Sequence, residues 1–271
     1  MSHRLGAHTL AKTAVIRELP SPTGPIVYRI WGRTRHKTLV LVHGGSGSWI
    51  HWAPVIPLLT RKVRVVAVDL PGFGDSAHGS IRNLDEIVDG LVAVIECEMR
   101  NLTEIAAFSF GAVCAAEALR KMDWPVDLHA VAPAGFGPSA LKPGALKSWS
   151  TIAELELRLL VHKQNLESSM LSNAAFATPS VVSAYASAVE RARFDTRECS
   201  FSHLFEIALP KMRLASVIWG RADAFVGADL DRRRKLIKDV HPGARQETIE
   251  NCGHWLQLEQ PAKLSRWIAP E

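Results

Sequence analysis

The residue with the clearest chemical potential is Ser109, which lies in the sequence Ala-Phe-Ser-Phe-Gly at positions 107–111. The apolar run 105–107 favours a strand before it, and the pattern of residues 113–120 favours a helix after it. Small residues two positions before and after a serine are typical of a nucleophile elbow, a strand-to-helix turn too tight for larger side chains. The turn exposes the hydroxyl beside the amino end of a helix, where free N–H groups favour negative charge. The motif by itself arises often by chance, so it needs partners elsewhere in the chain.

A serine hydroxyl is a poor nucleophile unless a base accepts its proton and a third group orients that base. His254 follows the last predicted strand, and Asp223 follows the penultimate one. Because the carboxyl ends of parallel strands meet at one edge of a sheet, we expect Ser109, Asp223 and His254 to lie together. No acid follows the predicted strand at 128–132, which leaves Asp223 as the candidate orienting group.

A second motif follows the apolar run 39–42, where the chain reads His43-Gly44-Gly45-Ser46-Gly47-Ser48. Glycines directly after a central strand let the backbone approach a ligand closely. The loop lacks the Lys-Ser/Thr of a P-loop and the spacing of a dinucleotide fingerprint, so a phosphate site is not expected. We expect His43 to be structural, behind this loop, and Asp69 and Asp75 to fix the loop after the next strand.

These motifs need a scaffold, and the order of predicted elements supplies one. Strands and helices alternate through residues 38–136 and again after 211, which predicts a parallel sheet with helices on both faces. Two strands within residues 10–31, separated by a Pro/Gly break, predict an antiparallel edge pair. The region 137–210 shows helical segments and no convincing strand. We therefore expect a core of residues 1–136 and 211–271 with an inserted helical cap, 137–210, whose helices fall near 149–160, 178–193 and 201–209.

Composition excludes several other classes of protein. The 271 residues are 47% hydrophobic and 22% charged, as in a soluble globular protein, with no apolar run long enough for a membrane span. The amino-terminal residues lack the apolar core of a signal peptide, and the four cysteines are scattered without metal-binding or disulfide spacing. We therefore expect a cytoplasmic protein that needs no metal. The net charge of +5 comes from basic residues mixed with 27 acids, so nucleic acid is not an expected partner.

The chain resembles cap-bearing α/β-hydrolases of the epoxide-hydrolase-like or meta-cleavage-product-hydrolase-like branch. The resemblance covers nearly the whole chain and is weakest in the cap. Each motif is modest, but all five in this order are specific. They are His43-Gly44-Gly45, Asp69-Leu70-Pro71-Gly72-Phe73-Gly74-Asp75-Ser76, Ala107-Phe108-Ser109-Phe110-Gly111, Gly220-Arg221-Ala222-Asp223 and Cys252-Gly253-His254-Trp255.

The resemblance implies an α/β-hydrolase fold with a mostly parallel eight-stranded sheet, and it implies a role for each site residue. Ser109 would attack an acyl carbonyl, His254 would carry the proton, and Asp223 would hold the imidazole. Backbone N–H groups of Phe110 and Gly45, with Ser46 as an alternative to Gly45, would form the oxyanion hole. No cofactor would be required, and the partner would be a small acyl substrate; a homodimer is left open.

Departures from the family pattern narrow the activity. Relatives that open epoxides or displace halide carry an aspartate where this chain has Ser109. Many carbon–carbon hydrolases of the meta-cleavage group have asparagine before the serine, and here it is Phe108. We therefore expect a serine hydrolase (an esterase) for a small, largely apolar ester, thioester or lactone. A carbon–carbon bond hydrolase and a non-catalytic ligand-binding protein remain alternatives, because fold alone does not fix function.

Overall fold

The computed structural model describes residues 7–33, 36–98, 102–122, 125–142, 144–196 and 202–269. Its centre is one eight-stranded sheet in the order β1-β2-β4-β3-β5-β6-β7-β8. The edge pair β1–β2 and the β2–β4 pair are antiparallel, and all other pairs are parallel. This confirms the predicted mostly parallel sheet. The strands are β1 (Val15–Leu19), β2 (Ile26–Trp31), β3 (Thr38–Val42), β4 (Arg64–Val68), β5 (Leu102–Phe108), β6 (Asp127–Val131), β7 (Arg213–Gly220) and β8 (Arg245–Ile249).

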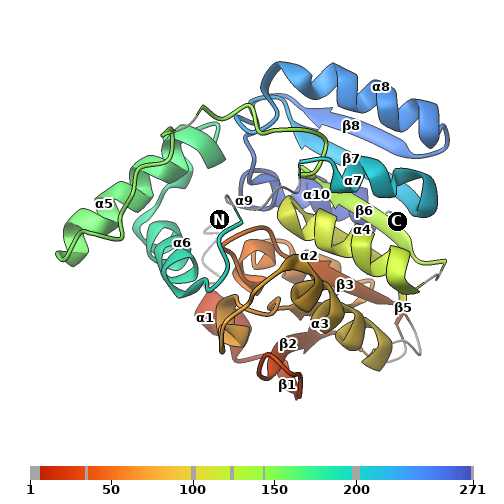
Figure 1. The fold of residues 1–271 in the computed structure, drawn as a ribbon, viewed down its shortest axis with the longest axis horizontal. Helices are drawn as coiled ribbons and strands as arrows, with labels where there is room; N and C mark the ends of the chain where they lie inside the picture. The colour runs from red at the N-terminus through yellow and green to blue at the C-terminus, as the bar shows by residue number, and fades with distance from the viewer. Residues whose placement is uncertain are drawn as a thin grey trace.

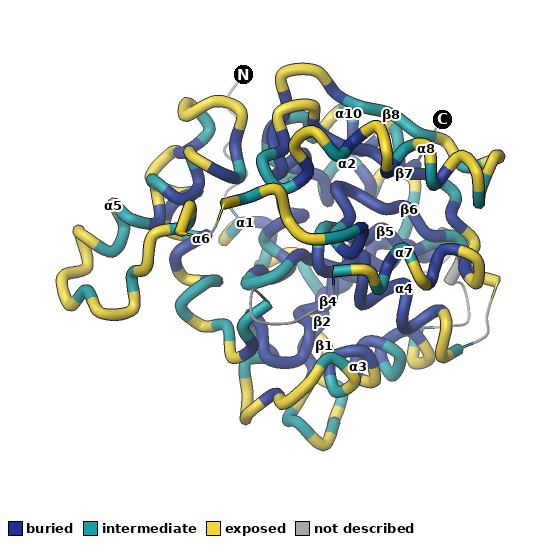
Figure 2. Tube along the Cα trace, turned by 45° about the horizontal axis from the view of Figure 1, so that its top comes forward, coloured by how far each residue is buried: buried dark blue, intermediate teal, exposed yellow. Residues whose placement is uncertain are grey.

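Burial explains why the central strands are apolar throughout. Every residue of β3 is buried, and Leu39 to Val42 are exposed by no more than 1%. Such strands are covered by helices on both faces, so they lack the alternation of half-exposed strands. The edge strand β1, by contrast, is exposed over most of its length. Figure 2 shows the same gradient, with dark blue strands inside and exposed segments around them.

Helices flank the sheet on both sides. In Figure 1, α3 and α4 lie in front of the strands, whereas α10 lies behind them. α3 packs against α4, and α2 against α10, so each face has its own helical layer. Pro261 lies in the first turn of α10, where its missing N–H leaves no hydrogen bond unmade. The core helices are α1 (Ala7–Ala11), α2 (Ile56–Leu59), α3 (Leu84–Cys97), α4 (Phe110–Met122), α8 (Leu230–Val240), α9 (Leu256–Glu259) and α10 (Pro261–Ile268).

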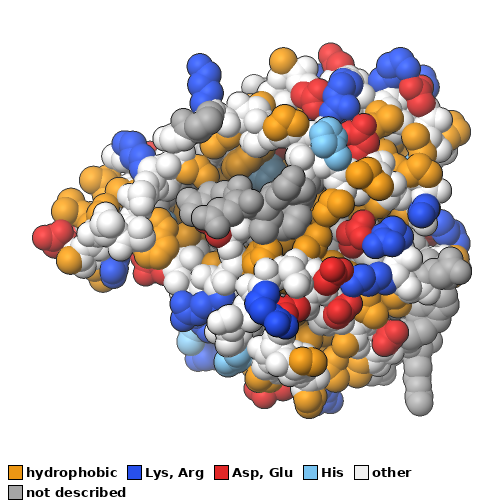
Figure 3. All heavy atoms as spheres, in the orientation of Figure 1, with side chains coloured by type: hydrophobic (Ala, Val, Ile, Leu, Met, Phe, Trp, Pro, Cys, Tyr) orange, Lys and Arg blue, Asp and Glu red, His pale blue; other side chains and the backbone are white. Residues whose placement is uncertain are grey.

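Two helices stand apart from these layers, α5 (Leu155–Asn165) and α6 (Pro179–Arg191), which Figure 1 shows beyond one end of the sheet. They pack on each other around a small apolar cluster of their own. Three leucines of α5 remain in solvent: Leu155, Leu157 and Leu160 are 57%, 50% and 49% exposed. Figure 3 shows hydrophobic side chains, in orange, on the left of the molecule, where Figure 1 places α5. A third helix of this region, α7 (Leu204–Ala208), instead packs on α4 and buries Phe205 completely.

The structure differs from the sequence predictions in two helical segments. The apolar spacing of Trp52, Val55, Ile56 and Leu59 predicts one helix over residues 49–60, but the segment forms a 3-10 turn (Trp49–Trp52) and then the short α2. Proline at 54 cannot donate a backbone hydrogen bond, which interrupts the segment. The helix expected from residue 149 begins at Leu155, after residues 148–154, which contain two serines and the β-branched Thr151 and Ile152. Serine favours turns and caps, and β-branched side chains lose rotamer freedom in a helix, so both weaken helix formation here. Residues 197–201, where a further predicted segment begins, lie outside the described residues.

A close contact between a helix and the end of a strand lies at Gly111, in the first turn of α4. A Cβ added to this glycine would lie 2.2 Å from the carbonyl oxygen of His43 and 2.9 Å from that of Val42. Both oxygens belong to the backbone at the end of β3, which cannot move aside cheaply. The small residue predicted at this position is therefore a steric requirement.

We expect Gly111→Ala to reduce the free energy of unfolding by about 2 kcal/mol or more, because the methyl group must displace packed backbone. Gly243→Ala is the matched control, since no atom lies within 4 Å of its added Cβ. The measurement is denaturant unfolding of both variants and the unmodified protein. Equal stability of the two variants would contradict the close approach of α4 to β3.

Candidate active site

The turn between β5 and α4 holds Ser109 in a strained conformation. Its φ is +51°, in the left-handed region that residues other than glycine rarely adopt. The turn is fixed by hydrogen bonds on both sides: Ser109 donates its N–H to the carbonyl of Val131 (3.0 Å), and its own carbonyl accepts from Ala112 (3.0 Å) and Ala134 (3.2 Å). Such strain persists only where the surroundings over-determine it, and it concentrates at functional sites.

The structure brings Ser109, Asp223 and His254 into one hydrogen-bonded chain. Nε2 of His254 lies 3.0 Å from Oγ of Ser109, and its Nδ1 lies 2.7 Å from Oδ2 of Asp223. Asp223 and His254 are 2% and 4% exposed, whereas Ser109 is half-buried and more open to solvent. Since a carboxylate accepts from Nδ1–H, Nε2 is left to accept the hydroxyl proton. This is the geometry of a nucleophile with its base and orienting group.

Two aromatic rings enclose the imidazole of His254. The ring centroid of Phe108 lies 4.9 Å from that of His254, and the centroid of Phe225 lies 4.5 Å away. Phe108, the residue before Ser109, therefore packs against the imidazole of His254. Sequence reasoning noted Phe108 only as a departure from the family pattern and missed Phe225, because neither residue belongs to a motif that indicates packing on a histidine.

The carboxylate of Asp223 has a second partner on its own loop. Its Oδ1 accepts the backbone N–H of Phe225 at 2.9 Å, while Oδ2 faces His254. This Asx-type turn orients the side chain. Asp229 directly precedes α8 and pairs with Arg232 and Arg233, so it is engaged at the start of that helix.

The glycine loop after β3 lies beside Ser109. A Cβ added to Gly44 would lie 3.2 Å from Cβ of Ser109 and 2.8 Å from the Phe108 ring. Ser46 also has a positive φ of 50°, so the loop turns sharply here. These contacts put the backbone of Gly44 and its neighbour Gly45 next to Ser109, on the same edge of the sheet as the first turn of α4.

Two buried histidines brace this loop. His43 accepts the N–H of Leu70 at Nε2 (3.0 Å), which leaves Nδ1–H to donate to the carbonyl of Gly44 (2.7 Å). Nδ1 of His51 accepts the N–H of the same glycine at 3.3 Å. Both imidazoles must be neutral to make these contacts. Burial lowers the pKa of His43 to about 4, and burial with the nearby His43 and His254 lowers the pKa of His51 well below its ordinary value.

A buried ion pair holds the adjoining loop. Asp69 is fully buried and accepts hydrogen bonds from the backbone of Trp49 (2.7 Å) and Asp75 (3.0 Å) and from Arg29 (3.2 Å). Burial raises the pKa of Asp69 to about 6, against the opposing effect of these donors. Arg29 also pairs with Asp75, which in turn binds Arg191 at the end of α6 (3.0 Å). The structure thus gives Asp69 and Asp75 the loop-fixing contacts expected of them.

The segment between α5 and α6 is tied to the loop that carries His254. The N–H of Trp255 donates to the carbonyl of Met170 at 3.0 Å, and the Trp255 ring packs in the apolar cluster of α5 and α6. The carboxylate of Glu259 accepts the N–H of Ser172 (2.8 Å) and that of Gly253 (3.1 Å). A displacement of this segment would therefore also displace the loop that carries His254.

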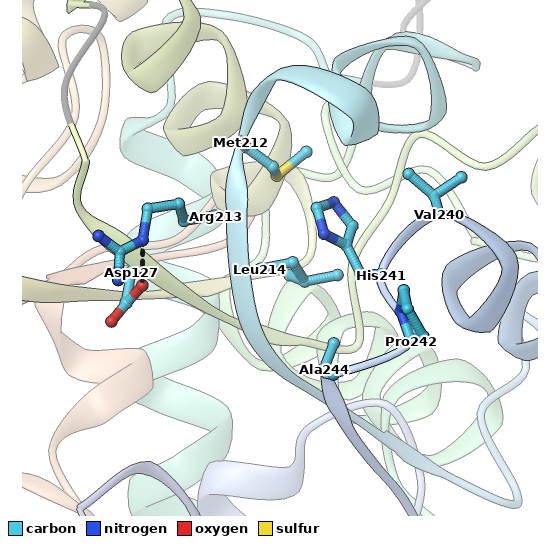
Figure 4. Close-up of a pocket in the computed structure, with 9 residues that line it drawn as sticks. Asp127, Met212, Arg213, Leu214, Val240, His241, Pro242 and Ala244 are labelled. Carbon is cyan, nitrogen blue, oxygen red and sulfur yellow. Dashed lines mark ion pairs between the residues drawn. The ribbon is translucent and has the colours of Figure 1, made fainter.

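Two other features of the structure lie away from this chemistry. A hollow of about 310 Å³, drawn in Figure 4, is lined by Asp127 and Arg213 at the amino ends of β6 and β7, opposite the strand ends that carry the serine and its partners. A second serine–histidine pair, Ser216 with His129 (2.7 Å), has Glu104 3.5 Å from the other ring nitrogen. Ser216 is completely buried, so no substrate can meet it.

Among the described residues, no three histidine, cysteine or acidic side chains are grouped so that they could hold a metal ion. In the same part of the chain, no helix combines the length and the apolar character needed to cross a membrane.

Comparison with known proteins assigns the chain to a family. A sequence profile of the Alpha/beta hydrolase family matches residues 39–267, and the chain belongs to that family. Its fold is the α/β-hydrolase fold, with helices on both faces of the eight-stranded sheet.

Individual relatives in the family are distant. The chain is 26% identical over 249 residues to the dihydrolipoyllysine-residue acetyltransferase component of the acetoin cleaving system of Pseudomonas putida. That match covers 84% of this chain but only 61% of the relative. The chain is also 25% identical over 277 residues to the monoacylglycerol lipase ABHD6 of Mus musculus, covering 89% and 77% of the two chains.

Solved structures share the fold at lower identity. The carboxylesterase CesB from Bacillus subtilis superimposes with a TM-score of 0.76 at 19% identity, covering 94% of this chain and 90% of that one. The meta-cleavage product hydrolase CumD from Pseudomonas fluorescens gives a TM-score of 0.75 at 19% identity, covering 93% and 95%. The similar proteins thus include a carboxylesterase, a lipase and a meta-cleavage product hydrolase.

The neutral histidines of the glycine loop make stability depend on pH. The unfolded chain binds a proton at His43 and at His51 below pH 6.5, whereas the folded state excludes both protons. His43 alone removes about 3 kcal/mol of unfolding free energy as the pH drops from about 6.5 toward 4, but Asp69, whose pKa is raised to about 6 in the fold, takes up a proton in the same window and returns a similar amount. The net fall in unfolding free energy therefore comes from His51.

Denaturant unfolding at several pH values between 6.5 and 4.5 measures this slope. Carboxylates whose pKa is lowered in the fold add their loss only at more acidic pH, below their ordinary values of 3.8 to 4.5. A stability profile that stays flat across this window would contradict neutral, buried histidines behind the glycine loop.

Proposed function

We propose that this protein is a cofactor-independent serine hydrolase that cleaves a small, largely apolar carboxylic ester, thioester or lactone. The observation that carries the proposal is the chain of hydrogen bonds from Ser109 Oγ through His254 to Asp223, with distances of 3.0 and 2.7 Å. A hydroxyl with a base in reach, and a base oriented by a buried carboxylate, is suited to acyl transfer. The aromatic rings around His254 favour an apolar substrate over a charged one.

In the proposed reaction, Oγ of Ser109 attacks the acyl carbon while its proton passes to Nε2 of His254. Asp223 stabilises the imidazolium through Nδ1–H. Backbone N–H groups of Gly45 and Phe110 receive the oxyanion; the position of Gly44 next to Ser109 supports this assignment. The C–O bond to the leaving group then breaks, and the leaving oxygen takes the proton from His254. Water repeats the sequence on the acyl-enzyme and releases the acid.

We propose further that residues 137–210 form a cap over this site. The support is the placement of α5 and α6 outside the core layers and their attachments to the loop that carries His254 and to the adjoining loop that carries Asp75. In this proposal, α5 and α6 cover the site, and α7 anchors the cap region by packing on α4. The Trp255 and Tyr185 rings, with centroids 6.5 Å apart, join the cap to the loop of the base.

A carbon–carbon hydrolase is a second candidate because of the similarity to the fold of CumD. Phe108 against the imidazole leaves an apolar wall in a position where that group often carries an amide. We expect the protein not to turn over a coloured dienol meta-cleavage product. The loss of visible absorbance of the dienol would measure any turnover. Turnover of the dienol that exceeded turnover of simple esters would reverse the order of the two candidates.

We expect Ser109→Ala to abolish hydrolysis of p-nitrophenyl butyrate, with a fall in kcat of about 10⁴-fold or more, because the nucleophile is lost. The folded state should change little, since alanine also fits the turn. The release of p-nitrophenolate and the thermal midpoint measure the two effects.

Ser80→Ala is the matched control, because this exposed serine lies on a surface loop and should leave the rate unchanged. Full activity in Ser109→Ala would remove the proposed nucleophile. Equal loss of activity in both variants would show that the effect does not come from the site.

A further inference from the structure

One side chain from the region of α5 and α6 touches the glycine loop directly. A Cβ added to Gly45 would lie 2.6 Å from Oγ1 of Thr196 and 3.1 Å from its Cγ2. The φ of Gly45 is not in the left-handed region, so its backbone conformation does not require glycine. The close approach of Thr196 does. Gly45 therefore leaves room for a threonine hydroxyl beside the loop that lies against Ser109.

Thr196 is held in place by contacts just before it in the chain. The N–H of Arg193 donates to the carbonyl of Gly72 at 2.8 Å. Phe194 is 7% exposed, and its ring centroid lies 6.4 Å from that of Phe73 and 6.3 Å from that of Phe110. The segment from 193 to 196 thus rests on the core and on the first residue of α4, so the hydroxyl has a fixed position over the loop.

Besides Ser109 itself, the other side chains nearest to these glycines are the Phe108 ring and the His51 imidazole. The Phe108 ring against Gly44 has no polar atom, and Nδ1 of His51 is occupied as an acceptor of the Gly44 N–H. The hydroxyl of Thr196 can donate one hydrogen bond and rotates to suit its acceptor. Besides Ser109 itself, Thr196 is the described side chain nearest to the three glycines of this loop that offers an O–H group.

We propose that Thr196 is a catalytic residue supplied by the cap, which donates its Oγ1–H to the substrate oxygen held by the N–H groups of Gly45 and Phe110. The proposal rests on the serine hydrolase function proposed above. A donor that meets this oxygen as negative charge develops on it lowers the barrier more than it strengthens substrate binding. Because Thr196 lies in the segment that follows α6, the oxyanion hole is complete only when residues 193–196 pack on the core.

The test compares Thr196→Val, which keeps the shape and removes the hydroxyl, with Thr196→Ser, which keeps the hydroxyl. Thr60→Val is the matched control, because the Thr60 hydroxyl donates to the carbonyl of Pro57. Thr60 lies just before the amino end of β4, whereas the site lies at the carboxyl ends of the strands. Two rates are measured for each protein: hydrolysis of p-nitrophenyl butyrate and labelling of Ser109 by an alkyl fluorophosphonate. Thermal midpoints within about 2 °C establish that each variant is folded.

We expect Thr196→Val to lower kcat about tenfold or more with little change in KM, and to slow the labelling of Ser109. Thr196→Ser should recover most of both rates, and Thr60→Val should match the unmodified protein. An unchanged kcat in Thr196→Val, or equal losses in the serine and valine variants, would overturn the role of the hydroxyl.

Failure of the underlying function gives a different result. In that case the unmodified protein neither hydrolyses the ester nor labels at Ser109, and the proposal for Thr196 falls with it. If the unmodified protein does both and Thr196→Val matches it, only the role of Thr196 is refuted.

Discussion

The imidazole of His254 has to reach two groups that lie far from it in the sequence, and the fold is arranged to satisfy that constraint. Ser109 follows β5, Asp223 follows β7 and His254 follows β8. These strands run parallel, with β6 between the first two, so their carboxyl ends meet at one edge. An error of about 1 Å in any of the three loops would break a hydrogen bond on which proton transfer depends.

The surrounding loops restrict how far these groups can move. The serine turn is hydrogen-bonded to the loop after β6, the glycine loop is braced by two neutral histidines, and the next loop is fixed by Asp69. A chain of ion pairs from Arg29 through Asp75 to Arg191 connects these loops to the end of α6. Burying such pairs contributes little net stability, so we interpret them mainly as devices that fix geometry.

The sequence predicted the parts of the site that follow from local pattern. The strand-to-helix turn at Ser109, the order of the strands and the placement of Asp223 and His254 each leave a signal within a few residues. The packing of Phe108 and Phe225 on His254 and the approach of Thr196 to Gly45 leave none, because each joins segments far apart in the chain. The late start of α5 was also missed, since apolar spacing does not mark where a helix begins without a capping residue.

The central claim is that Ser109 carries the acyl group during turnover, and trapping that intermediate tests it most directly. The protein is mixed with p-nitrophenyl butyrate, quenched in acid within milliseconds, digested, and analysed by peptide mass. We expect a butyryl group on the peptide that contains Ser109, and the same peptide unmodified in the Ser109→Ala variant. Rapid ester turnover with the acyl group on another residue would contradict the account.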